Sequence, residues 1–274
     1  MPKLDLRNAI RIKGAGGEIN ALKGHGFSWI KPSGDVDPIL AYFQSTGADG
    51  AYYTPWDKST LFQDAAGTIP VVNDGDPVGL MLDISGNGHH AVQSVSSRRS
   101  VYDESTGVGR IIPDRVDDTY NIPLRFIHPS SVIFCGQKTA TNDCDLVATS
   151  GISDNNGSIL FQIDGNSRVK GHFWREGLNV VTDDPIVSDS SIFVAAQKQD
   201  FNALYVKTQD NPWKANLRGT TPILSNRDYV LFGRGGSQGL SNYPTYGVLI
   251  VHELISDQQY DLFRAHLLSK AQGL

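Results

Sequence analysis

The sequence is poor in cysteine and in long apolar runs, and both shortages exclude classes of protein. Only two cysteines occur among 274 residues, Cys135 and Cys144, which is too few for a disulfide-rich scaffold or for a zinc site with paired cysteine ligands. The two thiols could bridge a hairpin, but we expect them to be free. No apolar run approaches the roughly 20 residues of a membrane-spanning helix, so we expect no membrane insertion.

Basic residues are too few and too scattered for a nucleic-acid surface. The formal net charge is −5, and no segment concentrates Lys and Arg as binding to a phosphate backbone requires. We therefore expect no nucleic-acid partner. The first residues, MPKLDLRNAIRIKG, carry charges where a signal peptide has its apolar core, so we expect synthesis in the cytoplasm.

Glutamate is scarce as well, and this shortage bears on the fold. Four of the 29 acidic residues are glutamates, and the rest are aspartates, which favour turns and caps over helix interiors. Together with 28 glycines and 13 prolines, they predict short strands joined by many turns. Strands are expected at 131–137, 158–163, 168–174, 191–197, 203–208, 229–233 and 246–253. The fold class predicted from these strands is all-β, a sandwich rather than a parallel α/β sheet.

One helix is predicted, at the end of the chain. Ser256 and Gln259 have the spacing of a capping box, and Gly273 provides a stop. The residues expected on the buried face are Leu262, Phe263, His266 and Leu267. We expect this helix to cover one edge or end of the sandwich.

The chain divides into three parts by composition. Residues 1–33 alternate around GAGG and GHG, which predicts a small β-structured segment that must anchor on the main domain or on a partner. Residues 34–49 form a linker with a short helix, and residues 50–274 form the sandwich domain.

Three blocks in order resemble a known family. Residues 50–93, GAYYTPWDKSTLFQDAAGTIPVVNDGDPVGLMLDISGNGHHAVQ, resemble a block common in tailed-phage virion proteins. The strands from SVIFCGQKT to NNGSILFQIDGNSRV and the ending YGVLIVHELISDQQYDLFRAHLLSKAQGL resemble concanavalin-A-like, laminin-G-like jelly rolls. The resemblance implies an all-β fold, a two-sheet antiparallel jelly-roll sandwich. For phage members it also implies a place on the virion, in a tail, baseplate, collar or head appendage.

That setting carries expectations about partners and location. The segment 1–33 would dock on other virion proteins, the subunits would form a homo-oligomer, and the jelly roll would face outward, where it could contact a host surface glycan. The expected function is a non-enzymatic structural component of the virion. The alternatives are a carbohydrate-binding receptor-recognition protein and a polysaccharide depolymerase.

The non-enzymatic expectation depends on missing motifs. A retaining glycosidase needs two carboxylates about 5 Å apart, and no two glutamates lie close together in this sequence. No GxSxG motif marks a nucleophilic serine, and GRGGSQG is not followed by a helix that would hold a phosphate. We therefore expect no catalytic residues.

Calcium is the one metal or cofactor for which the sequence offers ligands. NDGDP and DISGN provide Asp74, Asp76, Asp83 and Asn87, whose oxygen atoms suit a hard cation. The alternative is that these side chains cap backbone N–H groups in turns, and it is the one we favour. In the stretch DISGNGHHA, Gly86 and Gly88 would supply the positive φ angles of a tight turn.

Three aromatic residues are candidates for stacking on sugar rings: Trp213, Tyr243 and Trp174. They lie in or near predicted loops, and tryptophan and tyrosine combine an apolar face with a polar edge. We expect Trp213 and Tyr243 to be exposed.

Overall fold

The structure is a computed structural model that describes residues 36–139, 144–150, 159–173, 178–182, 191–200, 203–208, 212–217, 227–233 and 240–274. The chain forms two units, Met1–Asp37 and Pro38–Leu274. The strands predicted within residues 1–33 lie outside the described residues, so the anchoring role of this segment stays a prediction.

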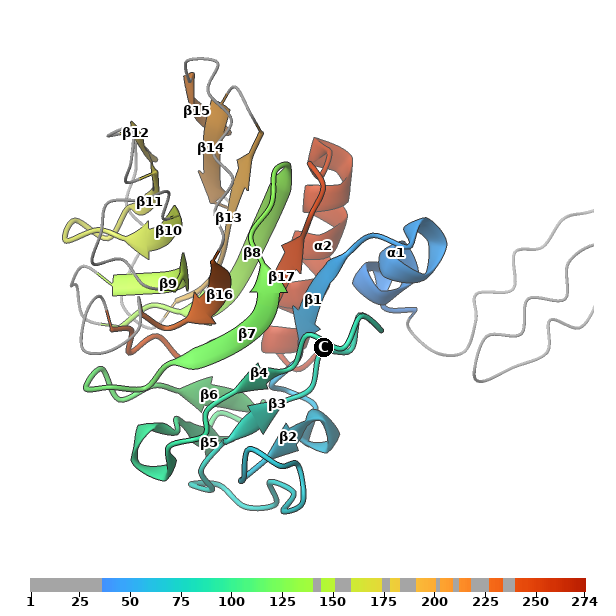
Figure 1. Cartoon of the computed structure of the whole chain (residues 1–274), viewed down its shortest axis with the longest axis vertical. Helices are drawn as coiled ribbons and strands as arrows, with labels where there is room; N and C mark the ends of the chain where they lie inside the picture. Colours follow the sequence, from blue (N-terminus) through green and yellow to red (C-terminus); the bar gives the residue numbers. More distant parts are fainter. Residues whose placement is uncertain are drawn as a thin grey trace, which may run out of the picture. The chain divides into compact units, whose positions relative to one another are not determined.

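The second unit is a sandwich of two antiparallel sheets (Figure 1). The eight-stranded sheet contains β1 (Gly50–Tyr53), β5 (Val101–Asp103), β6 (Arg110–Ile112), β8 (Ser130–Gln137), β13 (Ile192–Gln199), β14 (Ala203–Thr208), β15 (Lys214–Leu217) and β17 (Thr245–Val251). The nine-stranded sheet contains β2 (Leu61–Phe62), β3 (Leu80–Met81), β4 (Ala91–Val92), β7 (Tyr120–Arg125), β9 (Cys144–Thr149), β10 (Ile159–Ile163), β11 (Val169–Phe173), β12 (Leu178–Val181) and β16 (Asp228–Leu231).

Strand order confirms the all-β sandwich. The eight-stranded sheet runs β15-β14-β13-β8-β17-β6-β5, with β1 also paired to β17. The nine-stranded sheet runs β12-β11-β10-β9-β16-β7-β4-β3-β2. Each of the seven strands predicted from residue 131 onward is present, with ends that differ by two residues or fewer.

The main core lies between the sheets. On β8, Val132 and Phe134 point into this core, while the alternate residues Ile133 and Cys135 point to the other face of the same sheet. All four are buried, so the run VIFC is apolar on both faces. The eight-stranded sheet is therefore a middle layer, covered on each side.

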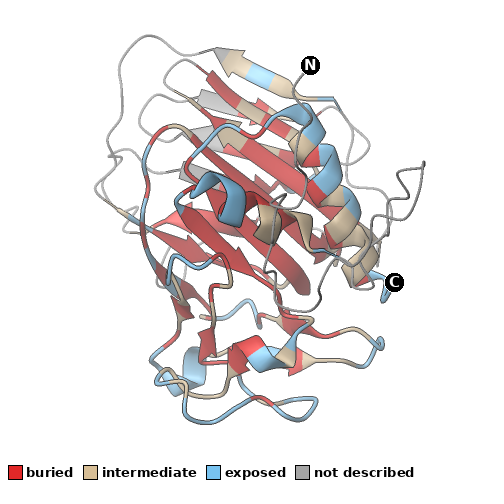
Figure 2. Cartoon of the chain, turned by 90° about the vertical axis from the view of Figure 1, so that its right-hand side faces the viewer, coloured by how far each residue is buried: buried red, intermediate tan, exposed pale blue. Residues whose placement is uncertain are grey.

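Two helices provide the cover on the outer side of the eight-stranded sheet. Figure 1 shows α1 (Pro38–Thr46) and α2 (Asp257–Ala271) on that side, and in Figure 2 the buried strands lie behind them. Phe263 and Leu267 of α2 and Tyr42 of α1 join the apolar cluster on this face. The predicted linker thus contains a helix that packs on the same cluster as the C-terminal helix.

The C-terminal helix starts as its sequence predicts. Ser256 accepts a hydrogen bond from the Gln259 backbone N–H (3.2 Å), and the Gln259 side chain accepts one from the Ser256 N–H (2.7 Å). Gly273 follows the helix with a φ of 74°. The expectation for Leu262 is wrong: it is 53% exposed, because the buried stripe runs through Tyr260, Phe263, Leu267 and Ala271 instead.

Both cysteines are free and buried, as expected. Burial raises the pKa of the Cys144 thiol to about 12 and raises that of Cys135 further. The two residues lie on different sheets, which a hairpin bridge would not allow. Within the described residues, neither α-helix has the length and hydropathy to cross a membrane.

Candidate functional site

The outer face of the nine-stranded sheet differs from the other sheet faces. The two inner faces meet in the main core, and the outer face of the eight-stranded sheet packs against α1 and α2. The nine-stranded sheet lies on the side of the sandwich away from these helices (Figure 1). Its outer face is thus the sheet face that neither helix covers.

Three polar residues form a row across the middle of this face, and we call them the polar row: Asp145 on β9, Gln162 on β10 and Lys170 on β11. Gln162 lies directly opposite Asp145 on one side and Lys170 on the other. Their strand neighbours, such as Phe161 and Ile163, point into the main core. Because side chains alternate along a strand, the polar row faces outward.

The polar row is partly enclosed although it lies on an outer face. Asp145 is fully buried and Gln162 is 6% exposed, while Lys170 is half-buried. The Gln162 Nε2 donates a hydrogen bond to the Asp145 carboxylate. A shift of register between Phe161 and Gln162 marks a bulge at this point, a device that re-aims side chains.

Two residues beside the polar row have a left-handed backbone conformation that is uncommon outside glycine. Ser167, in the turn between β10 and β11, has a φ of 62°, and Phe232, directly after β16, has a φ of 64°. The Phe232 N–H donates to the carbonyl of Leu146, the neighbour of Asp145 (3.1 Å). Such conformations persist where the surrounding structure fixes them, and they are found often at binding sites.

Asp164, two residues after Gln162, is held by hydrogen bonds within its own turn. Asp164 accepts hydrogen bonds from the Arg168 side chain (3.0 and 2.8 Å) and from the Asn166 and Arg168 backbone N–H groups (both 2.9 Å). Burial alone would raise the pKa of Asp164, but these bonds outweigh it and lower the pKa. Asp164 is therefore an ionised turn residue.

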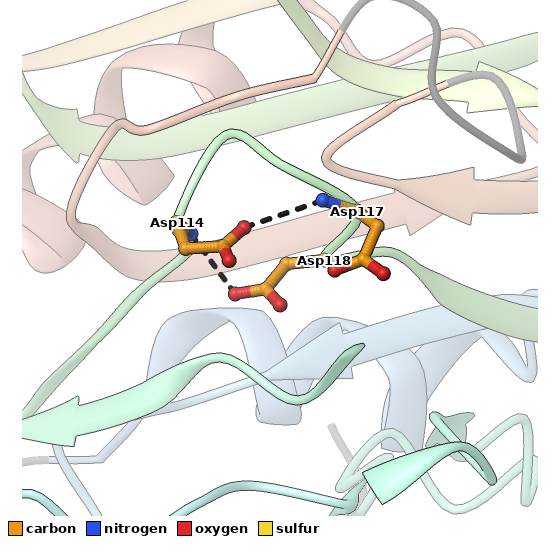
Figure 3. Close-up of side chains that lie close together, drawn as sticks. All are labelled: Asp114, Asp117 and Asp118. Carbon is orange, nitrogen blue, oxygen red and sulfur yellow. Dashed lines mark hydrogen bonds between the residues drawn. The ribbon is translucent and has the colours of Figure 1, made fainter. Parts of the chain in front are cut away.

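A second cluster of acids lies in the loop between β6 and β7. Asp114, Asp117 and Asp118 each have a carboxylate oxygen within 4.8 Å of those of the other two, close enough to hold a cation (Figure 3). Asp118 accepts from the Asp114 N–H (2.9 Å), and Asp114 accepts from the Asp117 N–H (3.4 Å). Burial is the main cause that raises the pKa of Asp118 above its ordinary value, and the neighbouring carboxylates also raise it. Sequence reasoning missed this cluster, whose signal was the run DRVDD.

The turn DISGNGHHA is organised by Asp83. Its carboxylate accepts hydrogen bonds from the N–H groups of Tyr52 (2.9 Å), Ser85 (2.9 Å) and His89 (3.0 Å), and from the Ser85 hydroxyl (2.9 Å). Asp83 is 7% exposed. These bonds are the capping arrangement that the sequence offered as the alternative to calcium.

The rest of that turn follows the same arrangement. Asn87 Nδ2 donates to the carbonyls of Ala48 (3.1 Å) and Gly50 (2.9 Å), which fixes the turn against the start of β1. Gly86 and Gly88 have φ angles of 99° and 82°, so the expectation of positive φ at both is confirmed.

The other two calcium candidates also accept backbone donors. Asp76 accepts from the N–H groups of Val72 and Asn73 (both 2.9 Å), and these bonds lower its pKa. Asp74 accepts from the Glu104 N–H at 2.8 Å. Capping explains the position of both side chains, and a calcium role for the four residues stays a prediction.

The aromatic candidates do not gather at one surface. Tyr243 is fully buried in the main core, with its ring 5.9 Å from that of Phe193, so its expected exposure is wrong. Trp213 is partly buried, packed on Tyr260 and beneath the ammonium of Lys198, which lies 4.2 Å from its ring centre. We expected both residues to be exposed because they lie in loops, but both loops fold back onto packed surfaces. Trp174 lies outside the described residues.

A histidine–aspartate cluster joins three segments near the start of β1. Asp49 bonds to His89 Nε2 (2.9 Å) through one carboxylate oxygen and to His252 Nδ1 (3.0 Å) through the other. His89 Nδ1 also faces the Pro123 carbonyl (3.0 Å). Burial lowers the pKa of His252, whereas the two histidines outweigh burial at Asp49 and lower its pKa. The cluster ties the DISGNGHHA turn to the first and last strands.

Comparison with known proteins gives a fold match without a sequence match. No family model and no curated protein matches the chain. An arabinofuranosidase complexed with arabinofuranosyl-alpha-1,2-xylobiose is similar with a TM-score of 0.62 at 10% identity, over 86% of this chain and 65% of that one. Trypanosoma rangeli sialidase in complex with the inhibitor DANA is similar with a TM-score of 0.51 at 8% identity, over 81% of this chain and 33% of that one.

These matches establish the fold, and this chain spans less than two thirds of either chain. They support the jelly-roll part of the family resemblance. Nothing in these matches points to a phage protein or to a laminin-G-like family, so both of these parts of the resemblance stay proposals.

The expectation that the chain is not an enzyme is corrected by the same matches. Glycosidases, a GH54 α-L-arabinofuranosidase among them, have this fold across most of the length of the chain. The expectation gave too little weight to a carboxylate pair assembled from distant segments, which a sandwich can bring together from separate strands. Asp145, which that argument passed over, is a carboxylate on the outer face of β9.

Proposed function

We propose that the chain binds a glycan on the outer face of its nine-stranded sheet. The observation that carries this proposal is the polar row, because it places amide, carboxylate and ammonium groups together on the sheet face that neither helix covers. Sugar hydroxyls are recognised by such planar and charged polar groups in a partly enclosed site. The shared fold with sugar-processing enzymes supports the same class of ligand.

A glycan array with wild-type protein and two variants tests this proposal. Gln162→Met keeps the length of the side chain and removes its amide, so we expect binding to be lost while the fold is retained. Gln258→Met is the matched control, because Gln258 is exposed on α2, on the far side of the eight-stranded sheet. Thermal unfolding confirms that both variants fold. A folded Gln162→Met variant that binds as wild type does would contradict the proposal.

Cleavage of the bound glycan is the second candidate function, and it requires Asp145, which is fully buried in this structure, to become accessible to the glycan. A glycosidase needs two carboxylates about 5 to 9.5 Å apart. On the described outer face, Asp164 is held by Arg168, which leaves Asp145 as the carboxylate beside the polar amide. The second carboxylate would have to come from another segment.

A chromogenic assay tests cleavage separately from binding. The probes are 4-nitrophenyl α-L-arabinofuranoside, used with one of the similar enzymes, and a 4-nitrophenyl sialoside. We expect Asp145→Asn to lower turnover by roughly 100-fold or more, as loss of a general acid or base does. Asp228→Asn, at the exposed start of β16, is the control. Turnover that survives Asp145→Asn would exclude Asp145 as the reacting carboxylate.

We propose further that the domain is part of a tailed-phage particle. The resemblance of residues 50–93 supports this setting, in which residues 1–33 dock on other virion proteins and repeated copies present the sandwich to a host surface glycan. Deletion of residues 1–33 should leave a folded protein that no longer enters particles. Incorporation of the truncated protein would refute the docking role, and electron microscopy of labelled particles would locate the domain.

A further inference from the structure

The charges on the outer face of the nine-stranded sheet are not balanced. At the β7 and β16 strands, Arg125 lies opposite Asp228, so each charge has an opposite charge as its cross-strand neighbour. At the turn of β10 and β11, Arg168 pairs with Asp164 at 2.8 Å. Lys170 differs from both arginines, because its neighbours across the strands carry no charge.

The residues directly opposite Lys170 on the two neighbouring strands are uncharged, and the charged residue two positions before it, Arg168, is already paired with Asp164. Gln162 lies opposite on β10 and Val181 lies opposite on β12. Lys170 is half-buried, and its ammonium makes no hydrogen bond or ion pair in the part of the chain that the structure describes. Asp145 is two strands away, at about 10 Å from the spacing of strands, and it is fully buried with Gln162 as a donor. The accessible charge in the row is therefore a single positive one.

A partly desolvated ammonium without a counter-ion attracts an anionic group. Hydrogen bonds between an ammonium and a carboxylate are stronger than neutral ones, and partial burial reduces their screening by solvent. The chain has a formal net charge of −5, so general attraction to anions does not account for this local feature.

We propose that the glycan bound by the polar row carries a carboxylate, and that Lys170 is the residue that binds it. This inference depends on the proposed glycan-binding function and deepens it to a substrate class, the acidic glycans. Gln162, next to Lys170, would then contact hydroxyl groups of the same sugar.

The test uses pairs of glycans that differ by one carboxylate-bearing sugar, such as sialyllactose and lactose. Wild-type protein, Lys170→Gln and Lys270→Gln are compared on the array and then by titration calorimetry at low and high salt. Lys270 is the matched control, because it is also half-buried and lies on the last turn of α2. We expect wild type to prefer the acidic member of a pair, and the preference to weaken with salt.

The variants separate the inference from the function on which it depends. Lys170→Gln should bind the acidic glycan about tenfold more weakly and lose the preference for it over the neutral glycan, while Lys270→Gln should bind both as wild type does. Binding without preference for acidic glycans, or an acidic preference that survives Lys170→Gln, would overturn the inference and leave the function standing. If the wild-type protein binds no glycan, both the proposed glycan-binding function and the inference about Lys170 are refuted.

Discussion

The substitution Asp83→Ala tests whether Asp83 stabilises the DISGNGHHA turn by accepting hydrogen bonds from buried N–H groups. It removes the acceptor for three backbone N–H groups, those of Tyr52, Ser85 and His89. Tyr52 is fully buried and Ser85 is 9% exposed, so these two donors would lose their partner without gaining water. A buried donor left without a partner costs about 1–3 kcal/mol, which gives about 2–6 kcal/mol for the two.

The measurement is the free energy of unfolding in urea, with Asp64→Ala as the control. Asp64 makes the same kind of turn, accepting from the N–H groups of Thr68 and Ile69 (both 2.9 Å), but on an exposed loop where water replaces the acceptor. We expect Asp83→Ala to lose far more stability than Asp64→Ala. Equal losses would refute the argument from burial.

The same unfolding series in excess calcium or in EDTA separates capping from metal binding. Capping alone predicts that the midpoint of wild type does not respond to calcium. A calcium-dependent rise in the midpoint that disappears in Asp83→Ala would show that Asp83 is a metal ligand instead.

Three further outcomes are expected. Burial lowers the pKa of His252, so below about pH 6.5 the unfolded chain takes up a proton that the folded chain does not. The free energy of unfolding should therefore fall as the pH drops through that value. His252→Gln should make the free energy of unfolding depend less on pH in this range. The lowered pKa of Asp49 adds a loss only at lower pH, as the pH falls through a folded value below 3.8. Leu267→Ala should cost about 2–5 kcal/mol in a urea titration because the side chain is fully buried, whereas Leu262→Ala, on the exposed face of the same helix, should cost less than about 0.5 kcal/mol. Both thiols should resist a thiol reagent in the native protein and react in urea, and a rapid native reaction would contradict their burial.

Local signals made much of the fold predictable. Strands such as β14 and β8 could be placed because their apolar runs end at clear turn sequences, and the C-terminal helix because Ser256 and Gln259 form a capping box. These features depend on neighbours within a few residues. The position of the last helix on the outer face of the eight-stranded sheet needed the packing of Phe263 and Leu267 against β8.

The candidate site was less predictable, because its residues meet only through sheet pairing. Asp145 stands in CDLVAT, a run that is typical of a buried strand, and nothing local shows that its side chain faces outward beside Gln162. A bulge sets that direction, and a bulge has no reliable signal in a single sequence. The predicted exposure of Tyr243 was wrong for a related reason, because a loop residue can still reach the core between two sheets.

A crystal structure of the protein with the glycan that binds best on the array would locate the binding site. We expect a sugar ring on the outer face of the nine-stranded sheet, within hydrogen-bond distance of Gln162 and with a carboxylate at Lys170. A glycan seated on the helix-covered side, or at the loops around Trp213, would contradict the proposed site.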